Sequence, residues 1–135
     1  MTNQEKKREL KKYRSLDQHI NSLLVERRMW FDRATKITPN MDGMPQGSGQ
    51  GDKISSAVIK IVELDQKIND EIDRLIETRE KIMGAIKNVD DERFRALLIY
   101  RYIDGMTWEQ IALETHYSYM QVCRLHGLAL EKIML

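Results

Sequence analysis

A run of apolar residues spaced by seven dominates the middle of the chain. Between residues 53 and 89 no proline occurs, and the first glycine is Gly84. A seven-residue repeat keeps one face of an α-helix apolar, so the run predicts a single helix about 50 Å long at ~1.5 Å per residue. A helix of this length needs a partner for its apolar face. The repeat consists of Ile54, Ile61, Ile68, Leu75, Ile82 and Val89.

The N-terminal segment, residues 4–36, has the pattern of such a partner. Its apolar and aromatic side chains recur at steps of three and four, which marks one face of a helix. They are Tyr13, Leu16, Ile20, Leu23, Trp30 and Ala34. In the heptad segment we place the second line of the contact four residues after each member of the first. This second line is Val58, Asp65, Ile72, Arg79 and Ile86.

The two patterns come into register if the chain folds back on itself. Pairing residues whose numbers sum to 88 sets Ile20 beside Ile68 and brings Arg27 within one layer of Asp65. We therefore predict a long antiparallel helical hairpin, a coiled coil, over residues 1–89. An intermolecular coiled coil through the same residues, and hence a homodimer, stays open as an alternative. The prolines (Pro39, Pro45) and four glycines fall between the two patterns, and they predict a flexible loop over about 37–52.

Residues 90–135 form a second predicted domain of three helices. Asp90-Asp91-Glu92 supplies capping and acidic residues for the first helix, and Gly105 suits a left-handed C-terminal cap. Its apolar face is Phe94, Leu97, Leu98, Tyr102 and Ile103. Two capping boxes follow, Thr107 to Gln110 and Ser118 to Gln121. They predict short helices over about 108–115 and 118–133, so the whole chain is expected to be all-α.

The link between the last two helices is short enough to make them cross steeply. Only His116 and Tyr117 separate the first helix from the second cap, and histidine tolerates the left-handed backbone that such a turn requires. Ile111, Val122 and Leu125 would fill the angle between the helices, and the small Ala112 would permit their close approach. This arrangement is typical of a helix-turn-helix, with the second helix in the major groove of double-stranded DNA.

Two stretches of this segment carry a family resemblance. The run from Arg101 to Ala112, with Tyr117-Ser118 and Gln121-Val122, resembles region 4 of sigma-70-type factors over roughly residues 93–133. Trp108 to Ala112, with His116 to Ser118 and Gln121 to His126, is similar to phage-encoded regulators of the ArpU/RinA type. The resemblance implies a sequence-specific regulator of phage or prophage transcription. The length of the predicted hairpin relative to this module suggests that the hairpin mediates self-association or contacts RNA polymerase.

The second helix of this motif holds the candidate base readers. Arg124 could bind guanine O6 and N7, Gln121 could read adenine unless its cap occupies it, and Tyr119 and Met120 could touch thymine methyl groups or sugars. Backbone contacts are predicted at Thr107, Tyr117 and Ser118, near the two helix starts. Three of these residues have a plainer alternative. Tyr119 and Met120 could be exposed apolar residues or cover the hairpin, and Arg124 could pair with Glu131 or another surface acid. Trp108 is interpreted as a packing residue.

The charge balance argues against unaided DNA binding. Net charge is +1, and residues 90–135 carry five basic and seven acidic side chains. Residues 1–35 carry nine basic and five acidic ones, so help could come from this basic helix, from a second copy or from polymerase. The basic residues near the N-terminus are Lys6, Lys7, Arg8, Lys11, Lys12 and Arg14, and a solvated helix end is the alternative interpretation.

Few features of the sequence support other classes of function. No Ser/His/Asp set, phosphate-cradling loop or carboxylate pair suggests an enzyme, and no cofactor is predicted. A zinc site would have only His116, Cys123 and His126, on different faces. No apolar run approaches ~18 residues, and a single cysteine fits a cytoplasmic protein. The rival functions are a small DNA-recognition subunit of a phage packaging terminase, and a protein-interaction adaptor of the sigma/antisigma kind.

Overall fold

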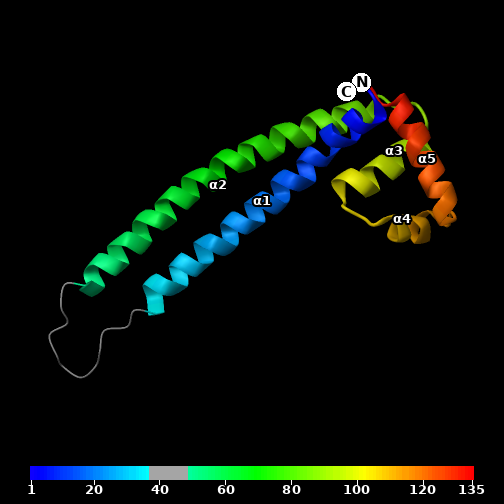
Figure 1. Cartoon of the computed structure of the whole chain (residues 1–135). Coiled ribbons are helices and arrows are strands. Elements are labelled where there is room, and N and C mark those ends of the chain that lie inside the picture. Colours follow the sequence, from blue (N-terminus) through cyan, green and yellow to red (C-terminus); the bar gives the residue numbers. More distant parts are fainter. Residues whose placement is uncertain (37–48) are drawn as a thin grey trace. The chain divides into compact units, whose positions relative to one another are not determined.

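The computed structural model describes residues 1–36 and 49–135, and everything regular in these residues is helical (Figure 1). No strand occurs among them, as the all-α prediction requires. Five α-helices and one π-helical segment follow in order. They are α1 (Asn3–Lys36), α2 (Gly49–Lys87), α3 (Glu92–Leu98), η1 (Ile99–Ile103), α4 (Trp108–Thr115) and α5 (Tyr119–Lys132).

The ends of the two long helices differ from the predictions in small ways. α1 begins at a capping box that the sequence analysis missed: the Thr2 hydroxyl accepts from the Glu5 amide (3.2 Å), and the Thr2 amide donates to the Glu5 carboxylate (2.8 Å). α2 begins at Gly49, so the predicted loop is wrong for residues 49–52. The rest of that loop, residues 37–48, lies outside the described residues.

The described residues form two compact units. One, here the core unit, consists of residues 1–17 and 74–135; the other, the paired-helix unit, is residues 18–73. Each unit therefore contains a part of α1 and a part of α2. The predicted domain boundary between residues 89 and 90 stays a prediction. The core unit extends across it, and side chains from both sides of the boundary pack in one core.

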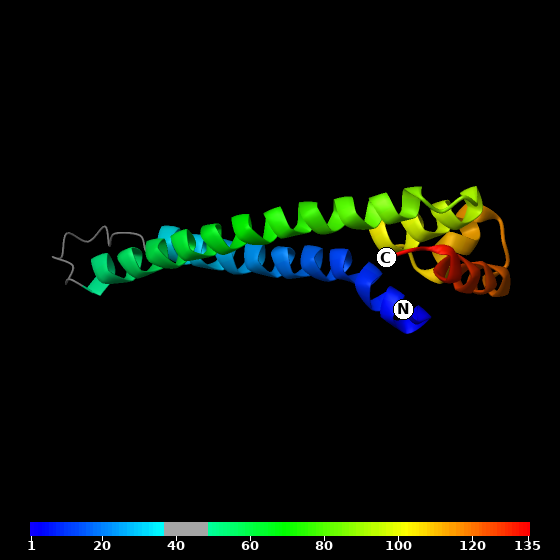
Figure 2. The same ribbon diagram turned by 90° about the horizontal axis from the view of Figure 1, so that it is seen from above.

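In the paired-helix unit, α1 and α2 lie side by side and run in opposite directions (Figures 1 and 2). Leu23 of α1 is buried against Leu64 and Ile68 of α2, and Trp30 packs on this cluster. Nearer the end of α1, Trp30 and Arg33 line one cavity together with Asp52, Lys53 and Ser56. The predicted neighbours Arg27 and Asp65 form an ion pair.

The second contact line predicted for α2 is wrong in this unit. Val58 and Ile72 are exposed, whereas Ala57 and Leu64 are buried. The contact line of α2 runs through Ala57, the half-buried Ile61, Leu64 and Ile68, alternating steps of four and three. The second line thus stands three residues after each member of the heptad repeat and not four, as knobs-into-holes packing also permits.

The core unit holds the larger hydrophobic core. It gathers side chains from both long helices and from every shorter element. Leu10 of α1 is fully buried there, although the sequence analysis left it out of the helix face. The chain termini belong to this unit and lie close together, since Met1 and Leu135 line one cavity. The buried members from residues 90–135 are Phe94, Leu97, Leu98, Tyr102, Ile103, Ile111, Val122, Leu125, Ala129, Leu130 and Ile133.

The predicted start of α3 is confirmed. Asp91 is the N-cap, and its carboxylate accepts from the Arg93 amide (2.9 Å). Arg95 holds the preceding turn, because its guanidinium donates to the carbonyls of Val89 (2.6 Å) and Asp90 (2.9 Å). Two charged side chains thus fix the direction in which the chain leaves α2.

The end of this helix is a π turn and not the continuous α-helix that was predicted to run to residue 103. The Asp104 amide donates to the Ile99 carbonyl (2.9 Å), five residues back. The wider turn lets the adjacent Tyr102 and Ile103 both be buried. Gly105 follows with φ +71°, the left-handed conformation predicted for it.

Candidate nucleic-acid interface

The first predicted cap of the motif forms in full. The Thr107 hydroxyl accepts from the Gln110 amide (3.2 Å), and the Thr107 amide donates to the Gln110 side chain (2.9 Å). These two bonds satisfy backbone donors that the first turn of α4 would otherwise leave open. Because the Thr107 hydroxyl is already an acceptor in the cap, its remaining capacity to bind a phosphate is as a donor.

The second cap forms in part. The Ser118 hydroxyl accepts from the Gln121 amide (3.1 Å), and no return bond from the Gln121 side chain is found in this described helix start. His116 ends α4 with φ 61°, so the predicted left-handed turn is confirmed. The Gln121 side chain is half-buried and free of the cap, which leaves its amide available to a ligand.

The angle between α4 and α5 is filled by the predicted residues. Ile111, Val122 and Leu125 are fully or almost fully buried, and Ala112 packs against them from the edge. α5 contacts both α3 and α4. The packed core on one face of α5 therefore fixes which side chains of this helix point outward.

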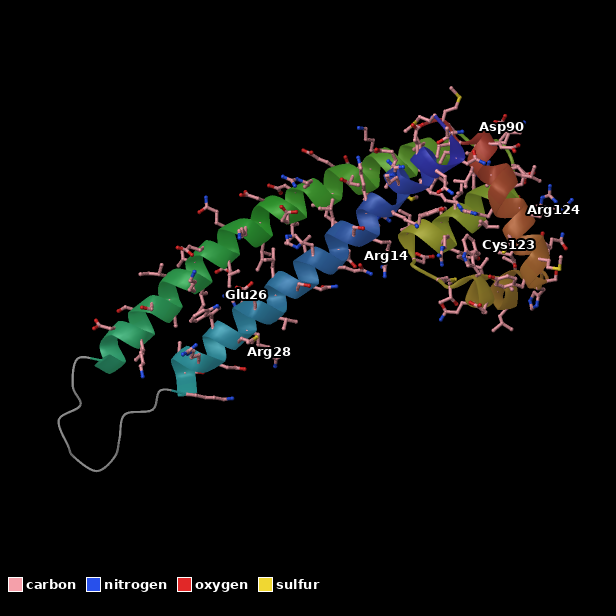
Figure 3. The ribbon with its side chains drawn as sticks, viewed as in Figure 1. Arg14, Glu26, Arg28, Asp90, Cys123 and Arg124 are labelled. Carbon is pink, nitrogen blue, oxygen red and sulfur yellow. The ribbon has the colours of Figure 1, made fainter. Side chains whose placement is uncertain are left out.

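The outer face of α5 carries the predicted base readers. Met120 is 81% exposed, and Arg124 lies one turn further along the same face. Arg124 makes no ion pair or hydrogen bond with any residue that the structure describes, so the alternative pairing with Glu131 is not found. Figure 3 shows Arg124 extending away from α5.

The remaining predicted contact residues differ in how far they are exposed. Tyr119 is about half exposed, and interaction with Cys123 raises the pKa of its hydroxyl. Ser118 and Thr107 are exposed at their helix starts. Tyr117 is half-buried and packs against the core, so only part of its ring is open to a ligand.

Trp108 is a packing residue, as the sequence analysis interpreted it. Its ring lies 4.5 Å from the ring of His126, measured between centroids, and at 60° to it. The Arg101 guanidinium stacks over the same indole, 4.1 Å from the Trp108 centroid, and donates to the Met106 carbonyl (2.9 Å). Arg101 was not predicted as a site residue, and its sequence position gave no sign of this stacking.

A buried polar pair underlies the site. The Tyr102 hydroxyl and His126 Nε2 are 2.6 Å apart and share a hydrogen bond. Burial, with the positive charges of Lys7, Arg101 and Lys11 nearby, lowers the pKa of His126 to about 4. Burial raises the pKa of Tyr102 to about 12. Both groups are thus uncharged near neutral pH, which suits a hydrogen bond inside an apolar core.

The basic start of α1 lies beside α5 in the core unit. Lys6 Nζ donates to the Leu130 carbonyl (2.7 Å), near the C-terminal end of α5, where the helix dipole favours a cation. Lys7 lines a cavity of about 310 Å³ with Cys123 and Gly127. Residues 1–17 carry six basic and three acidic side chains, and residues 74–135 carry nine of each, so the core unit has a net charge of +3.

Metal-binding geometry is not found near these residues. Across residues 1–36 and 49–135, no group of three or more His, Cys, Asp or Glu side chains could hold a metal ion. In the same part of the chain, no helix has the length and apolar character needed to cross a membrane.

Comparison with known proteins adds no relative. No family model, no curated protein sequence and no solved structure matches the chain.

Proposed function

We propose that this protein is a sequence-specific DNA-binding regulator of transcription. In this proposal α4, the turn at His116 and α5 act as a helix-turn-helix, and residues 118–133 enter the major groove of double-stranded DNA. The two long helices would form the antiparallel hairpin that carries this module. The observation that carries the proposal is the outer face of α5, on which Arg124 is unpaired within the described structure and Met120 is the most exposed large apolar residue of its helix.

The geometry of the α5 face supports base reading. The Arg124 guanidinium has no partner among the described residues, and a guanidinium can bind guanine O6 and N7 together. The buried positions Val122 and Leu125 hold the helix so that Gln121 and Arg124 are placed by the core and not by a loop. Fixed placement matters, because a bidentate contact tolerates little displacement.

Charge gives the second support. The segment 90–135 alone is acidic, but the packing of residues 1–17 with it brings in a net +3. Lys7 lies next to α5 and Lys11 is close enough to lower the pKa of His126. These lysines would attract phosphates without reading sequence. The proposed role in phage or prophage genes rests on the sequence resemblance alone.

Selection from a pool of random DNA duplexes tests this function. The full chain should enrich a defined motif, and the enriched duplex should bind at least about 10³-fold more tightly than a scrambled one at physiological salt. The measurement should be repeated at two salt concentrations, since phosphate contacts alone give binding that is salt-sensitive but indifferent to sequence. Failure to enrich any motif, even at low salt, would refute direct sequence reading.

A protein-interaction adaptor is the second candidate, because of two exposed side chains. Leu113 on α4 is 77% exposed and Met120 on α5 is 81% exposed, and the acidic Glu114 follows Leu113 directly. Apolar residues of this kind also suit a protein partner such as RNA polymerase. The adaptor predicts that the isolated chain binds polymerase, and that Leu113→Ala weakens this complex while no duplex is retained.

A packaging-terminase subunit would differ in assembly and not in the motif. Light scattering separates the two, because such a subunit should form a ring of many copies, whereas a regulator should be a monomer or dimer.

A further inference from the structure

The paired-helix unit leaves a line of apolar side chains uncovered. Each member directly follows a residue of the contact between the two helices: Leu24 follows Leu23, Phe31 follows Trp30, Val58 follows Ala57 and Val62 follows Ile61. We call Leu24, Phe31, Val58 and Val62 the side patch. These four side chains are between 45 and 60% exposed.

The four residues face the same side of the helix pair. Successive residues turn by about 100° around a helix, so each stands one step from the contact line in the same rotational sense. α1 and α2 run in opposite directions in this unit, and the same step in antiparallel helices leads to the same side. The side patch is therefore two helices wide. Asp65 lies between its members with its charge paired to Arg27.

The line of α2 residues that contains Val58 continues into the core unit, where the hydrophobic core covers it. Val58, Ile72 and Ile86 are spaced by fourteen and belong to one line of the heptad pattern. Ile86 is fully buried by the core, whereas Val58 is 49% exposed. The members of this line between them, Asp65 and Arg79, are charged, so the line is apolar at every second position. In the paired-helix unit its member Val58 stays half exposed.

From this we infer that the side patch is an interface between two copies of the chain, which pack as an antiparallel four-helix bundle. The charges of the unit favour a second copy. Residues 18–36 carry four basic and two acidic side chains, a net +2, and residues 49–73 carry three basic and six acidic ones, a net −3. If the two-fold axis runs parallel to the helices, each α1 neighbours the α2 of the other copy, so the opposite charges meet.

The patch would form the apolar centre of such a contact. The largest exposed apolar patch on a monomeric protein is roughly 300–600 Å² and is often functional. The side patch can supply a share of the ~800 Å² per partner that a stable dimer buries. Arg28 of α1, labelled in Figure 3, stands four residues after Leu24 and three before Phe31, so a charged side chain lies beside the patch. The exposed residues Val25 and Met29 lie on other faces of α1, whereas Ile59 stands three residues before Val62 and adjoins the patch.

Sedimentation analysis of the full chain tests the interface. The wild type should be a dimer of twice 15.9 kDa at micromolar concentration. Val58→Glu should raise the dissociation constant by about tenfold or more, because a charge would be buried at the centre of the contact. Phe31→Glu, on the other helix, should do the same. Both variants should keep the helical circular dichroism of the wild type.

The matched control is Met29→Glu. Met29 is 66% exposed and lies two residues before Phe31, about 200° around α1, so this variant introduces the same charge on a different face. It should remain dimeric. A wild type that is monomeric at micromolar concentration would overturn the inference. The patch would then stay exposed to solvent or bind a different protein. Equal weakening by Met29→Glu and Phe31→Glu would also overturn it. The result is independent of the DNA selection described above.

Discussion

Several single residues set the backbone of the core unit, and Gly105 is the most constrained of them. Its φ of +71° is costly for any residue with a Cβ, and a Cβ there would stand 2.5 Å from the Arg14 guanidinium carbon. Gly105→Ala should therefore lower the free energy of unfolding by about 1–2 kcal/mol. Urea denaturation measures it.

Gly84→Ala is the matched control for this substitution. Gly84 lies inside α2, and a Cβ added there would meet no atom within 4 Å, so the change should stabilise the protein by up to about 1 kcal/mol. Equal effects of the two substitutions would show that the left-handed conformation and the Arg14 contact contribute nothing.

His126 gives the protein a predictable pH dependence. Its pKa is about 4 in the fold against 6.5 in an unfolded chain, so between these values the unfolded state takes up the proton. Stability is fully present above pH 6.5 and should fall as the pH drops towards 4, by up to about 3 kcal/mol. His126→Phe should flatten this part of the curve in urea titrations at several pH values.

His19→Gln serves as the comparison, since His19 is an exposed residue of the paired-helix unit. The stability of this variant should change with pH as that of the wild type does. A wild-type stability that does not change between pH 6.5 and 4 would mean that His126 titrates normally in the fold.

Local features of single residues were the ones that the sequence predicted best. The Thr107 cap, the left-handed His116 and the left-handed Gly105 were all predicted and are confirmed. Each depends on chemistry within three or four residues, which a single sequence contains in full. The return bond of Gln121 is the exception, because side-chain placement there also depends on packing across the unit.

At the scale of elements, the first turns of α1 belong to the C-terminal core. Leu10 is fully buried and lies in the same core cluster as Ile86 and Leu97. Leu10→Ala should therefore lower stability by about 2–5 kcal/mol, the range for a buried leucine. Thermal or urea unfolding measures this.

Leu113→Ala is the control for Leu10→Ala, because Leu113 is also helical but largely exposed. It should change stability by less than about 0.5 kcal/mol. If Leu10→Ala were equally harmless, the start of α1 would not be part of the core.

The basic start of α1 should affect DNA binding without changing its sequence preference. Lys7→Gln together with Lys11→Gln should weaken binding to all duplexes and reduce the slope of log affinity against log salt by about 2. Lys53→Gln with Lys67→Gln, in the paired-helix unit, should leave the slope unchanged. Titrations at three or more salt concentrations separate the two cases.

Elements were only partly predictable for a physical reason. The heptad repeat indicated the length of α2. The lines of residues three and four positions after it are both partly apolar, and the sequence does not say which of them meets α1. Leu64 and Ala57 were therefore missed, and Val58 and Ile72 were wrongly placed in the contact. The π turn at Ile99–Ile103 was missed because it depends on burying Tyr102 and Ile103 together.

At the scale of the whole molecule, the proposed function and the inferred dimer make a joint prediction. A two-fold dimer presents two reading modules, so the selected DNA should contain two copies of one short motif. Val58→Glu should still bind a single motif but should lose the steep concentration dependence of the wild type on the paired site. Binding curves on one-motif and two-motif duplexes test this, and identical curves for wild type and variant would contradict it.

The central claim, that α5 reads bases through Arg124, is tested most directly by repeating the duplex selection with Arg124→Ala. Loss of one guanine contact should cost about 1–3 kcal/mol on the preferred duplex and relax the preference at a single base position, with other positions unchanged. Equal weakening on all duplexes, with the motif intact, would contradict the claim and assign Arg124 to the phosphate backbone.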